Sequence, residues 1–293
     1  MNYILENNKL KVSISDLGAE LQSIYGKTTS FEYLWQGSDK FWRNRATNVF
    51  PNCGRLYDGK YTYQNNTYEL PCHGFAGKSL FSVEYKDNNK IIFKLSDNGE
   101  TKKVYPFSFN FFVEYTLNEN KLTCTYRVEN TGDGDLPFSL GGHPGFNVPL
   151  DDGIEFDEHY LEFSEKCSPT SLDLSPTCFY VGTQSPFNLQ DGKLLKLRHE
   201  MFDNDAIFLT NMAKSVTLKS DKTSRYVKIN YPQMAHLGFW HNPKTNAPFI
   251  CIEPWNGVPG LDQTNEDFSN KTEFTHLDSK ETYTNFFEIQ VNE

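Results

Sequence analysis

The chain has 293 residues and a formal net charge of −10, with 38 Asp and Glu against 28 Lys and Arg. This acidic balance disfavours nucleic acid and anionic lipid as partners, because both are themselves negatively charged. No apolar stretch reaches the length of a membrane span, and the N-terminal residues lack the basic and apolar regions of a signal peptide. We therefore expect a cytoplasmic protein that binds neither nucleic acid nor a membrane.

The cysteines are scattered and form no C-x-x-C pair, which argues against a zinc site. Most lie in apolar or aromatic runs, so we expect buried reduced thiols rather than disulfides. They are Cys53, Cys72, Cys124, Cys167, Cys178 and Cys251.

Apolar and polar residues alternate with a period of two along most of the chain, which is the pattern of half-buried strands. In chain order it predicts strands at residues 10–14, 31–35, 61–63, 67–68, 81–85, 91–95, 107–117 and 122–128. Later strands are expected at residues 215–218, 226–231, 237–240, 249–252 and 286–291. Polar turns such as Asp87-Asn88-Asn89 and Asn118-Glu119-Asn120 join neighbouring strands into hairpins.

Helical periodicity is almost absent, and its best short candidate is residues 195–204. Residues 151–191 are rich in Ser, Pro and Asp, so we expect long loops and short strands on the rim there, not a domain boundary. Because no linker or internal repeat is visible, we interpret residues 1–293 as one all-β domain of two packed antiparallel sheets with few short helices. Sheets of this size curve, which leaves a concave face for a ligand.

Four short segments interrupt the strand pattern, at residues 51–55, 71–75, 140–146 and 252–257. His73 and His143 each adjoin glycine, which permits a close backbone approach or a positive φ. His143 and Glu253 each precede proline, which favours extended backbone, so we expect both where a strand leaves its sheet. Glu253 also follows an apolar run, and partial burial there would change its proton affinity.

Each of these side chains also has a simpler interpretation. His143 would be a turn histidine satisfied by backbone hydrogen bonds, Glu253 a surface salt-bridge partner, His73 a loop histidine and Arg55 a solvated turn arginine. The Gly-Gly-His-Pro-Gly setting favours a function for His143. No phosphate-binding loop, nucleophile elbow or catalytic-cysteine motif is present, and we expect no metal and no cofactor.

In these segments the sequence resembles the aldose 1-epimerase (galactose mutarotase-like) family, and most closely its LacX-type bacterial branch. The resemblance covers nearly the whole chain, and the order and spacing of the motifs carry more weight than any one motif. The matching residues are Gly18-Ala19-Glu20, Trp42-Arg43, Gly54-Arg55, His73-Gly74, Gly142-His143-Pro144, residues 203–207 and Glu253-Pro254-Trp255.

The resemblance implies a large antiparallel β-supersandwich with a sugar-binding cleft on its concave face. It also implies that Glu253 is the general base and His143 the general acid. By the same resemblance, Arg55, His73 and Asp205 hold the hydroxyls of the sugar.

Two features of the resemblance stay open. Asp203 lies two residues from Asp205 and is the alternative sugar-binding carboxylate. The better-known galactose mutarotases have Asn where Gly54 stands and a second glycine where Phe75 stands. These departures leave the identity of the sugar open.

Opening the cyclic hemiacetal of an aldose requires a base for the anomeric hydroxyl and an acid for the ring oxygen, and neither a metal nor a nicotinamide. We expect an ionised Glu253 and a protonated His143 in these roles, with a nearby carboxylate keeping the imidazole charged. Trp255 or Phe75 would pack against an apolar face of the sugar. The expected function is an aldose mutarotase that interconverts the α and β anomers of a hexose, as a monomer or homodimer.

Three alternatives remain. A glycoside hydrolase or lyase would normally need two carboxyl groups flanking the bond. A non-catalytic carbohydrate-binding protein would use the same aromatic and hydroxyl-binding residues. A hexose-6-phosphate mutarotase would need a basic pocket, for which Arg43, Arg45 and Lys78 are the candidates.

Overall fold

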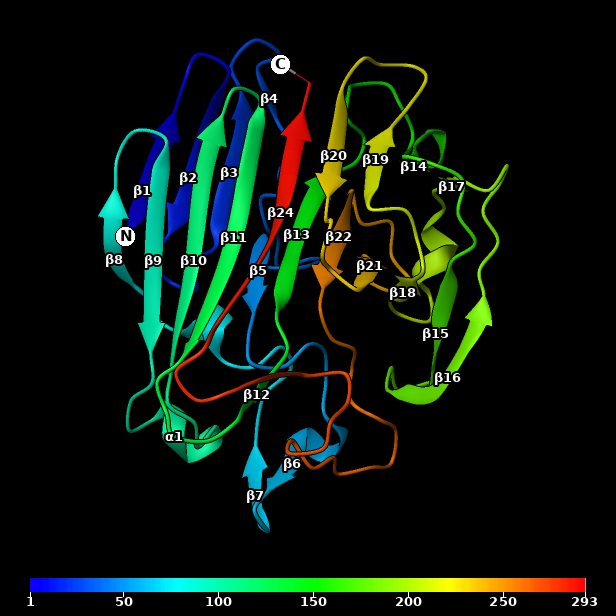
Figure 1. The fold of residues 1–293 in the computed structure, drawn as a ribbon. Helices are drawn as coiled ribbons and strands as arrows, with labels where there is room; N and C mark the ends of the chain where they lie inside the picture. Colours follow the sequence, from blue (N-terminus) through cyan, green and yellow to red (C-terminus); the bar gives the residue numbers. More distant parts are fainter. Residues whose placement is uncertain (293) are drawn as a thin grey trace.

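The computed structural model describes residues 1–292, and two large antiparallel sheets dominate it (Figure 1). The first has nine strands in the order β17-β14-β19-β20-β24-β11-β10-β9-β8, and the second has seven in the order β16-β15-β18-β21-β22-β13-β5. The expected all-β sandwich with few short helices is therefore confirmed.

The strands are distributed over the sheets as follows. The nine-stranded sheet contains β8 (Ser82–Lys86), β9 (Lys90–Ser96), β10 (Phe109–Asn118), β11 (Lys121–Asn130), β14 (Tyr160–Phe163), β17 (Leu194–Lys196), β19 (Ser215–Lys219), β20 (Tyr226–Asn230) and β24 (Thr282–Val291). The seven-stranded sheet contains β5 (Ala46–Val49), β13 (Gly141–Asn147), β15 (Thr170–Leu174), β16 (Tyr180–Pro186), β18 (Ile207–Thr210), β21 (His236–Trp240) and β22 (Phe249–Trp255). Smaller sheets are formed by β1 (Asn2–Glu6) to β4 (Phe31–Glu32) with β2 (Leu10–Ser15) and β3 (Leu21–Gly26) between them, by β6 (Lys60–Tyr63) with β7 (Asn66–Glu69), and by β12 (Leu136–Phe138) with β23 (Thr275–Leu277).

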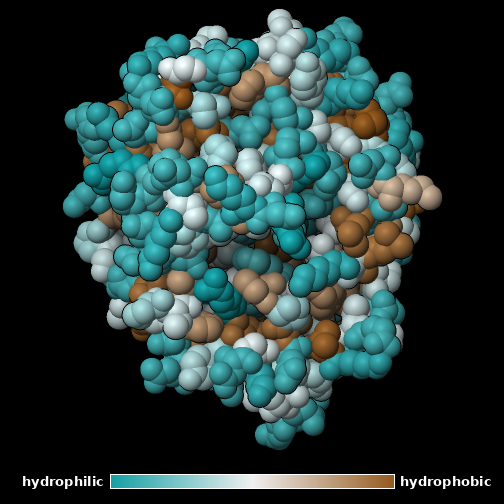
Figure 2. Space-filling model, turned by 180° about the vertical axis from the view of Figure 1, so that it is seen from behind, coloured by the Kyte–Doolittle hydropathy of each residue, from teal (hydrophilic) through white to brown (hydrophobic). Residues whose placement is uncertain are grey.

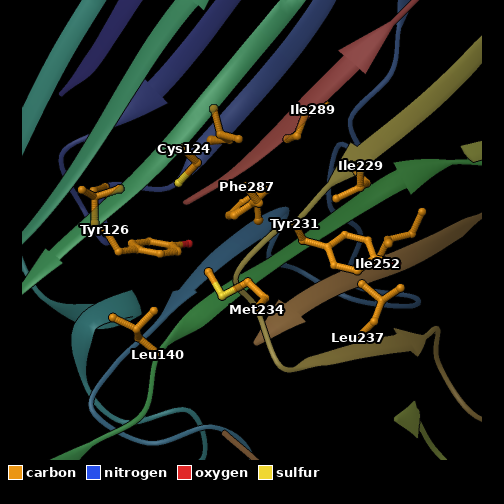
Figure 3. Packing of buried hydrophobic residues seen from close by; sticks show 14 of the residues in the cluster. Cys124, Tyr126, Leu140, Ile229, Tyr231, Met234, Leu237, Ile252, Phe287 and Ile289 are labelled. Atoms are coloured by element: carbon orange, nitrogen blue, oxygen red, sulfur yellow. The ribbon is translucent and has the colours of Figure 1, made fainter. Parts of the chain in front are cut away.

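The main core fills the space between the large sheets. Figure 3 shows this packing, in which Cys124 and Phe287 from β11 and β24 face Leu237 and Ile252 from β21 and β22. The four-stranded sheet extends the same core, because Tyr3 places its ring 5.6 Å from that of Phe93. A core of this size stabilises the fold mainly through buried apolar surface.

In residues 1–292, helical structure is confined to single turns. These are α1 (Thr101–Val104) and the 3₁₀ turns η1 (Tyr57–Gly59), η2 (Ala76–Lys78), η3 (Phe156–Glu158) and η4 (His199–Phe202). The helix expected at residues 195–204 is wrong: its first residues form β17, in which Leu195 pairs with Leu161, and only η4 follows. Leu195 and Leu197 stand two apart, a spacing that suits a strand better than a helix.

Residues 151–191 form loops and short strands, as expected, and they contribute β14 to one large sheet and β15 and β16 to the other. All six cysteines are free, and Cys53, Cys124 and Cys251 are buried, whereas Cys72 is exposed. Among residues 1–292 no helix has the length and apolar character needed to span a bilayer. The face seen in Figure 2 is largely hydrophilic and is hollowed near its centre.

Alternation in β22 sorts its side chains onto the two faces of the seven-stranded sheet, although all seven residues are buried. Ile250 and Ile252 join the main core, while Cys251 and Trp255 belong to separate clusters on the opposite face. Glu253 shares that opposite face because side chains two residues apart point the same way. The strand therefore contributes side chains both to the core and to the candidate site.

Candidate active site

A cavity of about 690 Å³, including its open mouth, lies on this opposite face of the seven-stranded sheet. Its size is in the range that holds small-molecule ligands. The side chains that the sequence singled out all line it, namely Arg55, His73, His143, Asp205 and Glu253. Residues that lie far apart in the chain thus meet in one cavity.

His143 and Glu253 lie opposite each other on neighbouring strands. The register of β13 and β22 pairs Gly141 with Trp255 and Gly145 with Cys251, which places His143 across from Glu253. The expectation that both residues sit where a strand leaves its sheet is wrong, because both lie inside strands. The following residues, Pro144 and Pro254, favour the extended backbone of these strands and lack an N–H to donate.

The side chains of His143 and Glu253 lie close together, but each keeps a polar atom without a hydrogen-bond partner. Nε2 of His143 lies 3.4 Å from Oε1 of Glu253, and the side chains are only 9% and 1% exposed. Nδ1 of His143 and Oε1 of Glu253 are buried and have no hydrogen-bond partner in residues 1–292. Unpaired buried polar atoms are destabilising and rare, so their presence in a cavity points to a polar ligand that completes them.

Burial changes the proton affinity of both groups. It raises the pKa of Glu253 well above its usual value, and the negative charge of Asp205 adds to this effect. Burial also lowers the pKa of His143 well below its usual value, with a further contribution from His73. Both shifts favour the neutral form of the group, so they oppose the expectation of an ionised Glu253 and a protonated His143.

His73 presents a hydrogen-bond donor to the cavity. Its Nδ1 accepts a hydrogen bond from the backbone N–H of Gly54 at 3.3 Å, and burial lowers its pKa to about 4. A neutral imidazole with Nδ1 occupied as an acceptor has its proton on Nε2. His73 has a φ of +65°, a backbone conformation that is uncommon for residues other than glycine.

Arg55 and Asp205 form an ion pair at the rim. Nη2 of Arg55 lies 3.1 Å from Oδ2 of Asp205, and the side chains are 47% and 16% exposed. Nη1 of the same guanidinium donates to the carbonyl oxygen of Thr177. Asp203 is directed elsewhere, where it accepts a hydrogen bond from the backbone of Lys244. Of the two candidate carboxylates, only Asp205 lines the cavity.

Comparisons with known proteins show the family of the chain. The family model described as aldose 1-epimerase matches residues 1–275. The chain belongs to the aldose 1-epimerase family. Within this family of isomerases acting on carbohydrates, the chain has a mutarotase-type role and takes a sugar as substrate.

Two relatives cover nearly all of the chain. Protein LacX (chromosomal) from Lactococcus lactis subsp. lactis is 32% identical over 296 residues, which cover 97% of this chain and 98% of the relative. A solved galactose mutarotase related enzyme from Lactobacillus acidophilus is 33% identical, with a TM-score of 0.96 and coverage of 100% of this chain and 98% of that one. The predicted family and its LacX-type branch are thereby confirmed.

A second solved structure agrees. The galactose mutarotase-like protein from Lactobacillus casei ATCC 334 is 29% identical, with a TM-score of 0.93, and the two chains cover each other completely.

Aromatic side chains form much of the wall of the cavity, and the sequence indicated only some of them. Trp255 lines the cavity as expected. Phe75 does not line it, because its ring packs in the main core 6.2 Å from that of Phe50. Trp42 stacks on His143 at 4.9 Å, and Trp240 lies 5.7 Å from the same imidazole. Trp240 follows the alternation of β21, whereas Trp42 lies in a loop where no periodicity could reveal it.

One group of potential metal ligands coincides with the acid–base pair. His143, Cys251 and Glu253 place ligand atoms within 4.8 Å of one another. The thiol of Cys251 is buried beside the pair, and burial raises its pKa well above its usual value. The grouping follows from the shared face of β22 and its neighbour β13, and we assign no metal to it.

Proposed function

We propose that this family member is an aldose mutarotase in which Glu253 is the general base and His143 the general acid. The observation that carries the proposal is the facing of His143 and Glu253, whose buried atoms Nδ1 and Oε1 have no hydrogen-bond partner among the described residues. An aldose supplies an anomeric hydroxyl and a ring oxygen for this space. General acid and base groups each typically contribute about 10²–10⁴-fold to rate.

The reaction needs one proton on the pair and returns it there. Ring opening moves the anomeric proton to Glu253 while His143 gives a proton to the ring oxygen. The open aldehyde rotates about C1–C2, and closure on the other face runs the two transfers backwards. The raised pKa of Glu253 and the lowered pKa of His143 favour the two neutral side chains, which is the arrangement that follows ring opening. Hydrogen bonds from the sugar to the carboxylate would favour the other arrangement before the reaction begins.

The other polar side chains suit the binding of hydroxyls. His73 donates through Nε2, while Arg55 and Asp205 offer a donor and an acceptor at the mouth. Trp255 adds an apolar surface within the cavity. This division places recognition at the rim and proton transfer at the floor.

An unphosphorylated aldose fits the charge of the cavity better than a sugar phosphate. Arg55 is the one cation among the described lining residues, and it is paired with Asp205, while Glu253 lies beneath. The three cations named for a phosphate lie elsewhere: Arg43 pairs with Asp39, Arg45 donates to backbone carbonyls, and Lys78 is exposed on η2.

Polarimetry of freshly dissolved α-D-glucose and α-D-galactose tests the proposal directly. We expect the protein to accelerate the approach to anomeric equilibrium and Glu253→Gln to remove most of the acceleration. A protein that binds these sugars without accelerating anomerisation would be a carbohydrate-binding protein. Release of reducing sugar from a glycoside would instead support hydrolysis. Glucose 6-phosphate serves as the comparison substrate, and preferential turnover of it would overturn the assignment to unphosphorylated sugars.

A further inference from the structure

An ion pair is buried outside the catalytic cavity, in the segment that follows β22. Nζ of Lys271 lies 2.5 Å from Oε1 of Glu266, and the two side chains are only 1% and 7% exposed. Neither of these two residues lines the cavity. Taking two charges out of water costs free energy, so a buried ion pair is weak evidence for stability. The other contacts of this pair show which part of the molecule it holds in place.

The second oxygen of Glu266 binds the backbone of residues 259–262. Its Oε2 accepts a hydrogen bond from the N–H of Leu261 at 3.1 Å. Gly260 packs against the same oxygen, because a Cβ added to it would lie 3.0 Å from Oε2. Hydrogen bonds to an ionised carboxylate are roughly twice as strong as those between neutral groups. The ion pair therefore holds residues 259–262 in one position.

Residues 259–262 in turn fix the backbone of Arg55 at the mouth of the cavity. The N–H of Gly260 donates to the carbonyl oxygen of Arg55 at 2.7 Å. Pro259 lines the cavity and packs against Gly54, where a Cβ would lie 2.9 Å from Cα of Pro259. The backbone of Arg55 is therefore bound by the residue next to the one that Glu266 holds.

The same residues also order the protein acceptor of the Arg55 side chain. The carbonyl oxygen of Gly260 accepts from the N–H of Tyr180 at 3.0 Å, and the N–H of Asp262 donates to the carbonyl oxygen of Tyr180 at 2.8 Å. Three residues before Tyr180, the carbonyl oxygen of Thr177 accepts from Nη1 of Arg55. Both the backbone and the guanidinium of Arg55 are thus tied to residues 259–262.

The ion pair is itself anchored on β6, away from the cavity. The N–H of Thr62 donates to the carbonyl oxygen of Glu266 at 2.9 Å, and the N–H of Phe268 donates to the carbonyl oxygen of Thr62 at 3.0 Å. In Figure 1 this part of the chain, in orange, passes beside β6 below the large sheets. The pair therefore connects a fixed strand to the mouth of the cavity.

We propose that Glu266 and Lys271 are positioning residues for Arg55, and that through Arg55 they set how tightly the enzyme binds its sugar. This inference rests on the proposed mutarotase function, in which Arg55 donates to sugar hydroxyls at the mouth. Proton transfer between the sugar and Glu253 or His143 does not involve the pair. Loss of the pair should therefore raise KM and leave kcat nearly unchanged.

A neutral double variant tests the proposal. Glu266→Gln with Lys271→Met keeps the approximate size of both side chains and leaves no buried charge unpaired. We expect it to fold, as checked by circular dichroism and urea unfolding. Polarimetric anomerisation should give a KM raised about tenfold, because small displacements far from the reacting atoms can cost up to about 10²-fold.

A matched control removes an ion pair elsewhere. Lys90 and Glu114 pair across β9 and β10 of the nine-stranded sheet, with Nζ 2.7 Å from Oε1. Neither of these two residues lines the cavity. Lys90→Met with Glu114→Gln should therefore change neither KM nor kcat.

Combination with Arg55→Met shows whether the pair acts through Arg55. Groups that act through one another are not additive, so the neutral pair should raise KM no further once the guanidinium is gone. A binding measurement makes this test independent of turnover. In the Glu253→Gln background, titration calorimetry should show the same loss of sugar affinity and the same dependence on Arg55.

The outcomes separate this inference from the proposed function. An unchanged KM in the folded neutral variant, a loss confined to kcat, or an equal further loss in the Arg55→Met background would overturn the positioning role. Failure of the neutral variant to fold would also overturn it, because the pair would then serve stability. Each of these results leaves the mutarotase assignment intact. Failure of the wild-type protein to turn over any sugar would overturn the proposed function itself.

Discussion

Nε2 of His143 lies 3.4 Å from Oε1 of Glu253, directly across two antiparallel strands in the middle of a sheet. The separation is therefore set by strand register, and not by the conformation of a loop. Because cross-strand neighbours have Cβ atoms about 4.5–5.5 Å apart, two side chains of this size are held close together whatever occupies the cavity. The two side chains are therefore held in place by the sheet, although Nδ1 of His143 and Oε1 of Glu253 have no hydrogen-bond partner among the described residues.

Replacement of the carboxylate by an amide should separate catalysis from binding. Glu253→Gln keeps the shape of the side chain but removes its ability to accept a proton, so we expect kcat to fall by about 10²–10⁴-fold. KM should change much less, because Arg55, His73 and Asp205 remain. Stopped-flow polarimetry over a range of sugar concentrations measures both quantities. Wild-type turnover in this variant would show that the base is another group.

The same substitution should stabilise the folded protein at neutral pH. Burial raises the pKa of Glu253 above 4.5, so the stability that its proton provides is full below pH 4.5 and is lost as the pH rises through the folded-state pKa. Glu253→Gln lacks this loss, and we expect it to exceed wild type by about 0.5–2 kcal/mol at neutral pH.

Urea unfolding at about pH 4.5 and pH 7.5 measures this difference. His143 contributes with the opposite pH dependence, because its lowered pKa gives stability that is present above 6.5 and lost at lower pH. That contribution is common to both proteins and cancels in the comparison. A gain that is the same at both pH values would contradict the burial of a protonated Glu253.

The plot of kcat/KM against pH should be bell-shaped, because the pair of Glu253 and His143 is active only when the two residues together hold one proton. Loss of activity on the acid side follows protonation of His143 below pH 6.5, and loss on the alkaline side follows ionisation of Glu253. The negative charge of Asp205 raises the pKa of Glu253. Asp205→Asn should therefore move the alkaline limb of kcat/KM to lower pH.

Asp203→Asn provides the matched control for this experiment. Asp203 lies two residues away but accepts from the Lys244 backbone outside the cavity, so its substitution should leave the pH profile unchanged. Asp205→Asn should also raise KM by about tenfold, through loss of a charged hydrogen-bond acceptor. A profile that is flat for wild type, or that moves equally in the two variants, would refute the shared-proton scheme.

Gly74 should tolerate no side chain. It has a φ of +70°, and a Cβ there would lie 2.2 Å from the carbonyl oxygen of Phe50. Gly74→Ala should therefore lower the free energy of unfolding by about 3 kcal/mol or more. Gly99→Ala is the control, because nothing lies within 4 Å of its Cβ position, and its effect should be within about 0.5 kcal/mol. Chemical denaturation compares the two, and equal stabilities would disprove the close approach.

The strands of the core could be predicted from the sequence because their physics is local. In β10 and β11, apolar residues alternate over ten positions each, and Asn118 and Lys121 close the turn between them. Asp205 of the candidate site could be predicted only through the family resemblance. It belongs to no strand pattern in the sequence, and its backbone has a φ of +78°. Trp42 gave no local signal of its contact with His143.

Two other features depend on tertiary structure. The pKa shifts of Glu253 and His143 follow from their burial, which residue identities do not reveal. The placement of both residues inside strands was missed because proline suggests an interruption, whereas both prolines here lie within strands of the seven-stranded sheet. Between the pairs Gly141–Trp255 and Gly145–Cys251, where both prolines lie, the ladder of β13 and β22 has no paired residues.

The side chains of β22 alternate between the core and the cavity, and this alternation limits which mutations the strand tolerates. Insertion or deletion of one codon within residues 249–255 would turn every following side chain over. The carboxylate of Glu253 would then point into the hydrophobic core, and an isoleucine side chain would point into the cavity instead. Folding and activity would fail together from one such event, so this stretch can vary by substitution but has no freedom in length.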